Sequence, residues 1–428
     1  MDNPKRSILF VLSSFFPHHR AGTEKYVLTL AKGLMRKGWE VEVAIPVLSD
    51  VEDYVFDEIP VHTYRVSTQL NLKEEFGSGI MEGEAGFTQI LDQVRPNIVH
   101  FHTLLSRTIP MRFALIAKNM VGNVFVTPHL GGFFCLRGDY LQDGKEACNG
   151  EVHWRKCGSC FFKGKSNLYK FLPKPLVWFG VGNQFLGARL PIKRERDLKA
   201  LSESGIHFIA ISKWIYEVFN KNNFTKVHKV LQGVPNVVQP NLVRAPLQNG
   251  LVKLLFVGRI TPSKGLDLII QSALKLSKLQ SVHLTVLGIP DPDYLDFGLN
   301  QRKAVEQIKG WIWKEMASFD EVQSAMWNHD LLVLPSRSNE MAPLVILEAI
   351  NAGLPVIGSS LRAVKEMIEH YQCGWVFEMG RENALLEVLK TATEQEEYSK
   401  VKEGMPLEGR SDQDVVQEQE AIYLTQLV

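Results

Sequence analysis

The strongest constraint on the fold of this chain is a repeated order of apolar run, polar loop and helix-forming segment. Residues 8–12 form a continuous apolar run, a predicted helix follows over about 23–37, and residues 41–45 form the next run. Such runs are typical of parallel strands that helices cover on both faces. The same order restarts at residues 254–257. The pattern predicts an α/β fold with two doubly wound, Rossmann-like domains.

Proline and glycine interrupt any helix between residues 235 and 250, and we place the domain boundary there. The first domain is expected over 1–240, with a cysteine-containing insertion over about 135–205. The second domain is expected over 241–411. A last helix is predicted over 412–428, and it is expected to pack either locally or back on the first domain.

Composition excludes several classes of protein. The 48 basic and 47 acidic residues leave a net charge of +1, so no global field attracts nucleic acid, and we expect no nucleic-acid partner. No run approaches the roughly 18 apolar residues that cross a bilayer. The run at 8–12 lacks a following cleavage site and is interpreted as a buried strand rather than a signal peptide. The sequence therefore favours a cytoplasmic, reduced protein.

Ligands of open α/β sheets bind beyond the carboxyl ends of the strands, and one loop there carries two cations. Residues 258–265 follow a predicted strand and contain Arg259 and Lys264, five positions apart. An arginine can clamp phosphate oxygens in a bidentate manner, whereas a lysine acts as a point charge. The pair suits a diphosphate; solvated surface charge is the alternative. Neither a complete dinucleotide-binding glycine fingerprint nor a P-loop sequence is present.

A second segment combines a helix start with two carboxylates. Pro343 suits the first position of a helix, where its missing N–H costs nothing. The amides of the first turn, around Leu344 and Val345, would then face the crevice as an anion site. Glu340 precedes this helix and Glu348 lies inside it, so the two carboxylates are expected to contact different parts of one elongated ligand rather than act at one atom.

These features together resemble retaining glycosyltransferases of family 4, whose fold is GT-B. The resemblance rests on Arg259 with Lys264, on the pair 335–336, on Glu340 and Glu348 with seven residues between them, and on four segments nearer the start, which are 16–24, 99–102, 127–129 and 210–213. It spans nearly the whole chain and is weakest over 135–205 and 288–320.

The resemblance assigns roles on the donor side. It implies that Arg259 and Lys264 bind the donor diphosphate, that Glu348 bonds the ribose hydroxyls, and that Glu340 contacts the transferred sugar. The amides near Pro343, Leu344 and Val345 would hold sugar and phosphate.

In the first domain, the resemblance implies that Gly22 lets the donor phosphates or the acceptor approach the backbone closely, as part of the donor site, and that His129 lies near the reacting centre. It also implies a reaction that retains anomeric configuration and needs no metal. The expected partners are a nucleotide-diphosphate sugar and a glycan, lipid-linked or other hydroxyl acceptor, in surface polysaccharide or glycoconjugate synthesis.

Two rival functions stay open. One is another GT-B enzyme, such as a sugar-nucleotide epimerase or a phosphorylase, and the other is a non-catalytic sugar-nucleotide-binding subunit. The chain also departs from the family pattern, since Met341 and Ala342 stand where many members have glycine after the first glutamate. The sequence Asp291-Pro292-Asp293 matches a metal-binding DxD pattern, but its context predicts an ordinary loop.

Four of the five cysteines lie within the insertion. Cys157 and Cys160 have the spacing of a metal knuckle, and Cys135 and Cys148 would complete a tetrahedral structural zinc site. Free thiols and a disulfide or redox role are the alternatives. An aromatic segment over 171–179, followed by Lys193, Arg194, Arg196 and Lys199, is a candidate contact with the inner face of a membrane. Packing of the insertion on the first domain is the alternative.

Overall fold

The computed structural model describes residues 6–19, 21–49, 51–66, 82–104, 108–163, 189–236, 250–315 and 318–427. The chain divides into two compact units. The first consists of Met1–Gln232 together with Asp412–Val428, and the second of Gly233–Ser411. The predicted linker near residue 240 and the aromatic segment 171–179 lie outside the described residues.

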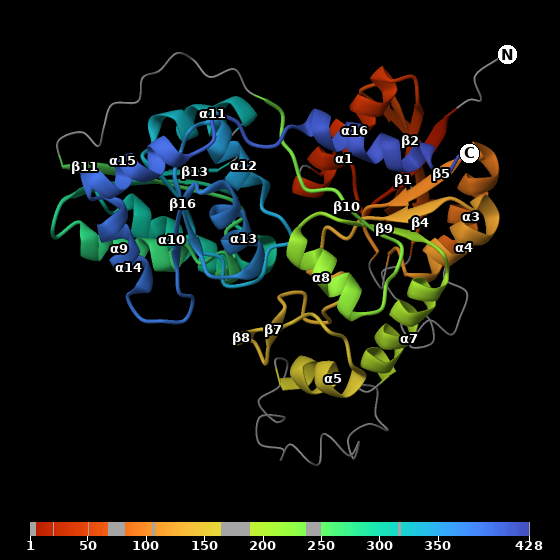
Figure 1. The fold of residues 1–428 in the computed structure, drawn as a ribbon, viewed down its shortest axis with the longest axis horizontal. Helices are drawn as coiled ribbons and strands as arrows, with labels where there is room; N and C mark the ends of the chain where they lie inside the picture. The colour runs from red at the N-terminus through yellow and green to blue at the C-terminus, as the bar shows by residue number, and fades with distance from the viewer. Residues whose placement is uncertain are drawn as a thin grey trace. The chain divides into compact units, whose positions relative to one another are not determined.

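The first unit is built on a largely parallel sheet with the strand order β10-β9-β6-β5-β1-β2-β4-β3 (Figure 1). Its strands are β1 (Ser7–Val11), β2 (Glu40–Val47), β3 (Tyr54–Phe56), β4 (Ile59–Arg65), β5 (Ile98–Phe101), β6 (Val124–Val126), β9 (His207–Ala210) and β10 (Val227–Lys229). The edge strand β3 runs antiparallel to β4. Strand β5 is buried along its whole length, including its one polar side chain, His100.

Helices cover this sheet, and one of them comes from the far end of the sequence. The helices are α1 (Gly22–Arg36), α3 (Glu82–Val94), α4 (Arg112–Val121), α5 (Trp154–Lys163), α7 (Arg189–Glu203), α8 (Lys213–Lys221) and α16 (Asp412–Leu424). Helix α16 packs on α1 and buries Val416 and Tyr423 in the core of this unit. The C-terminal helix therefore returns to the first unit, one of the two placements that the sequence left open.

The second unit contains a parallel sheet with the strand order β13-β12-β11-β14-β15-β16. The strands are β11 (Leu251–Val257), β12 (Ser281–Leu287), β13 (Ile312–Lys314), β14 (Leu331–Leu334), β15 (Val356–Ser359) and β16 (Gly374–Phe377). The helices are α9 (Leu266–Leu276), α10 (Leu295–Glu306), α11 (Phe319–Asn328), α12 (Leu344–Asn351), α13 (Arg362–Tyr371), α14 (Ala384–Ala392) and α15 (Gln395–Gly404). Two parallel α/β sheets confirm the predicted fold class.

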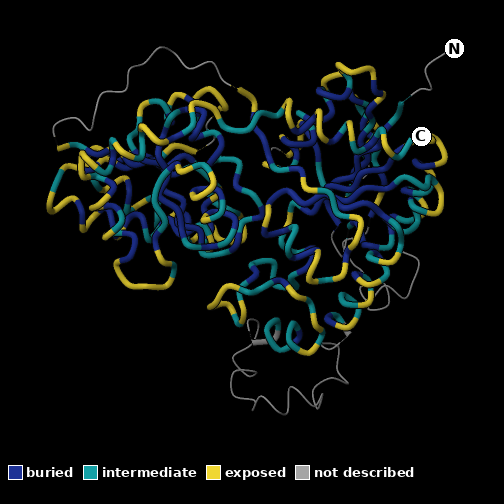
Figure 2. The backbone as a smooth tube through the Cα atoms, in the orientation of Figure 1, coloured by how far each residue is buried: buried dark blue, intermediate teal, exposed yellow. Residues whose placement is uncertain are grey.

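Each sheet is the buried centre of its unit (Figure 2). Neighbouring residues of β11 point to opposite faces, so Phe256 and Leu255 belong to two different hydrophobic clusters. The chain leaves β11 to form β12 and β13 on one side and later returns to form β14 on the other. The position beside β11 is therefore the point where the strand order reverses, which is where open α/β sheets bind ligands. Within the described residues, no helix is both long and apolar enough to cross a membrane.

Candidate active site

The loop after β11 lies close to the loop after β14, and a glycine makes this close approach possible. Gly265 has φ +71°, a left-handed conformation that favours glycine. A Cβ atom added there would lie 2.2 Å from the carbonyl oxygen of Pro335, so the close approach of the two loops also requires a residue without a side chain. This contact brings the end of the first loop, at Lys264, next to the segment that carries Glu340.

Lys264 and Glu340 form an ion pair in which Nζ lies 2.5 Å from Oε1. The hydroxyl of Ser336 donates a second hydrogen bond of 2.6 Å to the same oxygen. The side chains of Lys264 and Glu340 are only 24% and 17% exposed. Burial alone would raise the pKa of the Glu340 carboxyl, but the Lys264 ammonium and the hydrogen bonds outweigh it and the pKa is lowered. Glu340 is therefore held as a carboxylate.

Arg259 directly follows Gly258 at the end of β11, and its side chain is more exposed to solvent than that of Lys264. Its guanidinium donates a hydrogen bond of 3.2 Å to Asp291, and its side chain is 71% exposed. Asp291 also accepts a hydrogen bond from the backbone N–H of Asp293, which caps a short 3-10 turn over Pro292–Tyr294. The DxD sequence is thus a capped turn that pairs with Arg259, in agreement with the predicted loop.

Arg337 joins the loop after β11 to the loop after β14, and no sequence motif pointed to it. Its guanidinium donates two hydrogen bonds, of 2.8 and 2.7 Å, to Asp267 at the start of α9, and a third of 3.1 Å to the carbonyl of Pro262. Its own backbone N–H bonds the carbonyl of Ser263. The available signal was its position directly after Ser336, at the end of a predicted strand.

Helix α12 begins at Leu344. Pro343 has ψ 106° and is the N-cap of the helix, so the placement of Pro343 at the first helical position was wrong. A proline carries no N–H, and the first amide that the helix can offer to a ligand therefore belongs to Leu344, followed by that of Val345. Glu348 lies half-buried in the second turn of α12.

In the first unit, Gly22 is the exposed first residue of α1, and a Cβ atom there would meet no other atom within 4 Å. No contact inside the protein therefore requires glycine at this position. The loop before α1 is fixed by the buried Glu24, whose carboxylate accepts hydrogen bonds from the Ser14 hydroxyl, at 2.8 Å, and from the Ala21 backbone, at 3.1 Å.

His129 follows β6, is half-buried and belongs to a cluster with the buried His100 and His102. Its Nε2 lies 3.1 Å from Nδ1 of His102, and its ring packs on Tyr26 with 4.8 Å between centroids. Burial lowers the pKa of His129 to about 3 and also lowers that of His102, where the neighbouring histidines add to the effect. These rings are therefore neutral at neutral pH, and His129 is suited to hydrogen bonding rather than to carrying charge.

We expect acid to destabilise the first unit through His100, His102 and His129. Burial lowers the pKa of all three, whereas each titrates near 6.5 in the unfolded chain. Below pH 6.5 the unfolded chain binds more protons than the folded one, so the free energy of unfolding should fall by about 3 kcal/mol between pH 6.5 and 5.5. Urea unfolding at several pH values measures this slope.

The matched variants for this pH series are His129→Gln and His370→Gln. His370 is exposed on α13, so its replacement should leave the slope unchanged. The His129 variant should lose about 1 kcal/mol of the fall, the share of one histidine, while His207 and His228, whose pKa values burial also lowers, remain in both variants. Equal slopes in both variants would contradict burial of a neutral His129.

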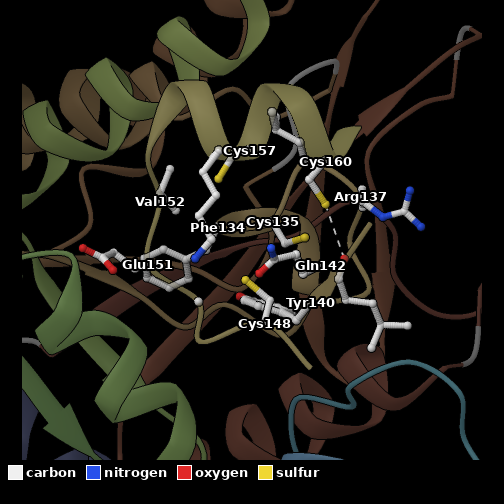
Figure 3. Close-up of a pocket in the computed structure, with 14 residues that line it drawn as sticks. Phe134, Cys135, Arg137, Tyr140, Gln142, Cys148, Glu151, Val152, Cys157 and Cys160 are labelled. Atoms are coloured by element: carbon white, nitrogen blue, oxygen red, sulfur yellow. Dashed lines mark hydrogen bonds between the residues drawn. The ribbon is translucent and has the colours of Figure 1, made fainter. Parts of the chain in front are cut away.

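The four cysteines of the insertion line one cavity (Figure 3). Among the residues that the structure describes, no three histidine, cysteine, aspartate or glutamate side chains converge closely enough to hold a metal ion as they stand. None of these thiols forms a disulfide: Cys135, Cys148, Cys157 and Cys160 are all free cysteines. The zinc site thus stays a prediction.

Two of the four basic residues expected at a membrane surface point elsewhere. Lys193 pairs with Asp197 on the same helix, and the guanidinium of Arg194 donates to the backbone carbonyls of Gly132 and Phe133. The contacts of Arg194 favour the alternative, in which the insertion packs on the first domain. Arg196 and Lys199 are largely exposed, at 69% and 73%.

Two family models match the chain. The model described as glycosyl transferases group 1 matches residues 242–403, and the model described as glycosyltransferase family 4 matches residues 20–146. Together they cover about two thirds of the chain. The group 1 model contains every site residue predicted in the second unit. The family 4 model contains Gly22 and His129.

Similar proteins agree with these matches. An uncharacterized glycosyltransferase of Methanocaldococcus jannaschii is 32% identical over 126 residues, which are 29% of this chain and 31% of that protein. The amylovoran biosynthesis glycosyltransferase AmsK of Erwinia amylovora is 27% identical over 165 residues, 36% of this chain and 39% of its own length. The matches thus span between 31% and 39% of the length of these relatives.

A solved structure of Anabaena HepE, in complex with UDP and glucose, covers 98% of this chain and 99% of its own, with 14% identity and a TM-score of 0.62. This likeness extends the shared fold over nearly the whole length. With both family models matched, the chain belongs to the group 1, family 4 glycosyltransferases, enzymes of GT-B fold that take a sugar from a nucleotide-sugar donor.

Proposed function

We propose that this enzyme is a metal-independent, retaining hexosyltransferase that moves a sugar from a nucleotide-diphosphate sugar to a hydroxyl acceptor. The observation that carries the proposal is the buried pair of Lys264 and Glu340 at the strand reversal of the second sheet. A fixed cation there suits a diphosphate, and a fixed carboxylate beside it suits the hydroxyls of the attached sugar.

On the donor side, Lys264 and Arg259 would neutralise the diphosphate and support the departing nucleotide. Lys264 is the better placed of the two, since its side chain is mostly buried and that of Arg259 is open to solvent. The amides of Leu344 and Val345, at the positive end of α12, would add hydrogen bonds to phosphate or sugar. Glu348, half-buried in that helix, would accept hydrogen bonds from the ribose hydroxyls.

Lys264, Arg259 and the amides of α12 together supply the charge neutralisation that a metal ion would otherwise provide. That chemistry is the reason for proposing a metal-independent transfer. Arg337 would act as a positioning residue, because it ties the Lys264 loop to the segment that carries Glu340.

In the first unit, the roles of Gly22, at the donor phosphates or the acceptor, and of His129 remain those that the family resemblance implies. His129 would accept or donate one hydrogen bond near the reacting centre, as a neutral ring. The acceptor itself is proposed to be a glycan or lipid-linked molecule of surface polysaccharide synthesis, supported by the similarity to AmsK, which is named for amylovoran biosynthesis.

Rival functions differ in what they consume. An epimerase would convert the nucleotide sugar with no second substrate, and a phosphorylase would need inorganic phosphate. A non-catalytic subunit would bind the donor yet neither transfer the sugar nor slowly hydrolyse the donor. Incubation of the chain with a bound donor, followed by analysis of the released nucleotide and sugar, separates these cases.

The first test is a thermal-shift screen against a panel of nucleotide sugars, followed by calorimetry of Arg259→Ala with the matching nucleoside diphosphate. Removing a charge-assisted hydrogen bond costs about 1.5–3 kcal/mol. Because Arg259 is 71% exposed and screened by solvent, we expect the lower end of that range, about a tenfold weaker Kd. Replacement of the exposed Lys278 of the same unit should leave binding unchanged. Equal Kd values for wild type and Arg259→Ala would remove Arg259 from the donor site.

A further inference from the structure

The four cysteines of the insertion come from three separate segments that fold around one cavity. Cys135 follows a 3-10 turn at Gly131–Phe133, Cys148 follows the small hairpin β7 (Leu141–Gln142) and β8 (Glu146–Ala147), and Cys157 and Cys160 lie on α5. Only Cys373 of the five cysteines is elsewhere, buried in the second unit. Four thiols from three consecutive segments therefore line the same cavity.

The size of this cavity is informative. Its volume is about 30 Å³, more than the roughly 10–15 Å³ that one buried water molecule needs, so a single ion has room among the thiols. Figure 3 shows the four labelled thiols on different sides of this space.

Two of the four sulfur atoms accept backbone hydrogen bonds, which partly oppose the burial that raises the pKa of the Cys135 and Cys160 thiols. The backbone N–H of Asp143 donates a hydrogen bond of 3.1 Å to Sγ of Cys160. The Cys135 sulfur receives backbone hydrogen bonds from Tyr140 and Arg137. Lys156 also lines the cavity, and its charge would offset part of the charge that a four-thiolate site carries.

The lobe that holds the cavity is attached to the first unit by polar contacts. Asn222, at the end of α8, bonds the backbone of both Val152 and Gly150, and Glu195 of α7 accepts a hydrogen bond from the backbone N–H of Trp154. The hairpin β7–β8 has two residues in each strand, and α5 has ten. A metal ion that crosslinks the segments of a lobe with so little regular structure would stabilise its fold.

We propose that Cys135, Cys148, Cys157 and Cys160 bind one structural zinc ion that crosslinks this lobe. The bound ion would draw the sulfur atoms from the cavity wall to Zn–S distances of about 2.3 Å, with release of the thiol protons to solvent. The ion would lie in the first unit and serve the fold of the lobe; the donor chemistry assigned to Lys264 and Glu340 does not involve it. The proposal is therefore independent of the proposed function.

The experiment measures zinc per chain, by elemental analysis, in the full chain purified with a reductant and without chelator. We expect about one zinc ion per chain in the wild type and less than about a tenth in Cys157→Ser/Cys160→Ser, which loses half of the ligand set. Cys373→Ser is the matched control, since it removes a buried thiol from the other unit, and it should keep about one ion.

A second measurement needs no variant and covers the case in which the double variant fails to fold. Titration of the wild type with a mercurial thiol reagent should release the zinc, in step with modification of the cysteines, to a chromogenic chelator. Exchange of the zinc for Co(II) should give the charge-transfer and ligand-field bands of a tetrahedral thiolate site.

Three results would each overturn the proposal. The first is a wild-type chain with less than about a tenth of a zinc ion even after incubation with zinc under reducing conditions. The second is a zinc content that persists in a folded Cys157→Ser/Cys160→Ser variant. The third is iron in place of zinc, with the visible absorption of an iron–sulfur centre.

Discussion

Replacement of Lys264 by alanine is expected to lower kcat for sugar transfer by about 10²–10³-fold, the usual loss when one preorganised donor is removed from a developing negative charge. Binding of the nucleoside diphosphate should weaken by about 100-fold, more than in Arg259→Ala, because the Lys264 ammonium is mostly buried. The measurements are steady-state transfer, or slow donor hydrolysis where the acceptor is unknown, and calorimetry with the nucleoside diphosphate.

The same substitution also leaves the Glu340 carboxylate buried without its cation. Breaking a buried pair in this way typically costs 3–5 kcal/mol, and loss of the ammonium lets burial raise the pKa of Glu340. A defect in Lys264→Ala would therefore arise in two ways, from the lost contact with the donor or from the orphaned carboxylate.

The double variant Lys264→Ala/Glu340→Gln separates these causes. If Lys264 only neutralises Glu340, the neutral glutamine should restore diphosphate binding to within about threefold of the wild type. If Lys264 also contacts the donor, as we propose, binding should remain about 100-fold weak. Restored binding in the double variant would therefore refute the donor role of Lys264, and Lys278→Ala serves as the surface control.

The sequence was sufficient to predict these positions because the strands of the second sheet are continuous apolar runs with sharp ends. Residues directly after such a run lie at the carboxyl edge of the sheet whatever the strand order, and this applies to Arg259 and to the segment before Glu340. The contact between Lys264 and Glu340 follows from the pairing of β11 with β14. The roles of these residues remain predictions until the substitutions above are made.

Other features depend on long-range geometry that no local pattern contains. The bidentate pair of Arg337 and Asp267 requires two loops to meet that lie 70 residues apart. Pro343 was assigned to the first helical position although it is the N-cap, because proline is acceptable at both positions. The common cavity of the cysteines depends on how α5 packs against the segment after β6, which the irregular sequence of the insertion does not reveal.

The clearest example of such a long-range contact is Tyr423 of α16. Its hydroxyl donates a hydrogen bond of 2.8 Å to Gln419 and lies 2.6 Å from Nδ1 of His100, whose other nitrogen bonds Thr127. Because the hydroxyl proton is used toward Gln419, the Nδ1–H of His100 must donate to Tyr423, and Nε2 then accepts from the hydroxyl of Thr127. The C-terminal helix thus fixes the tautomer of a histidine in the sheet.

Replacement of Tyr423 by alanine should consequently produce the largest loss of stability. The ring is fully buried, with centroids 5.0 Å from Phe125 and 5.9 Å from Trp39, and truncation of a large aromatic side chain costs about 3–5 kcal/mol. The orphaned His100 and Gln419 add about 1–3 kcal/mol each. The sum approaches the whole stability of a typical domain, so the first unit should be largely unfolded at 37 °C.

Hydrogen exchange measured peptide by peptide tests this expectation, because the second unit serves as an internal control. In Tyr423→Ala, amides of α1 and β5 should lose protection while those of β11 and β14 keep theirs, since the two units have separate cores. Tyr423→Phe keeps the ring and should cost only the hydrogen bonds, about 1–3 kcal/mol, with protection largely retained. Unchanged protection of α1 in the alanine variant would mean that α16 does not pack there in solution. A loss as large in the phenylalanine variant would mean that the hydroxyl, rather than the buried ring, holds α16 in place.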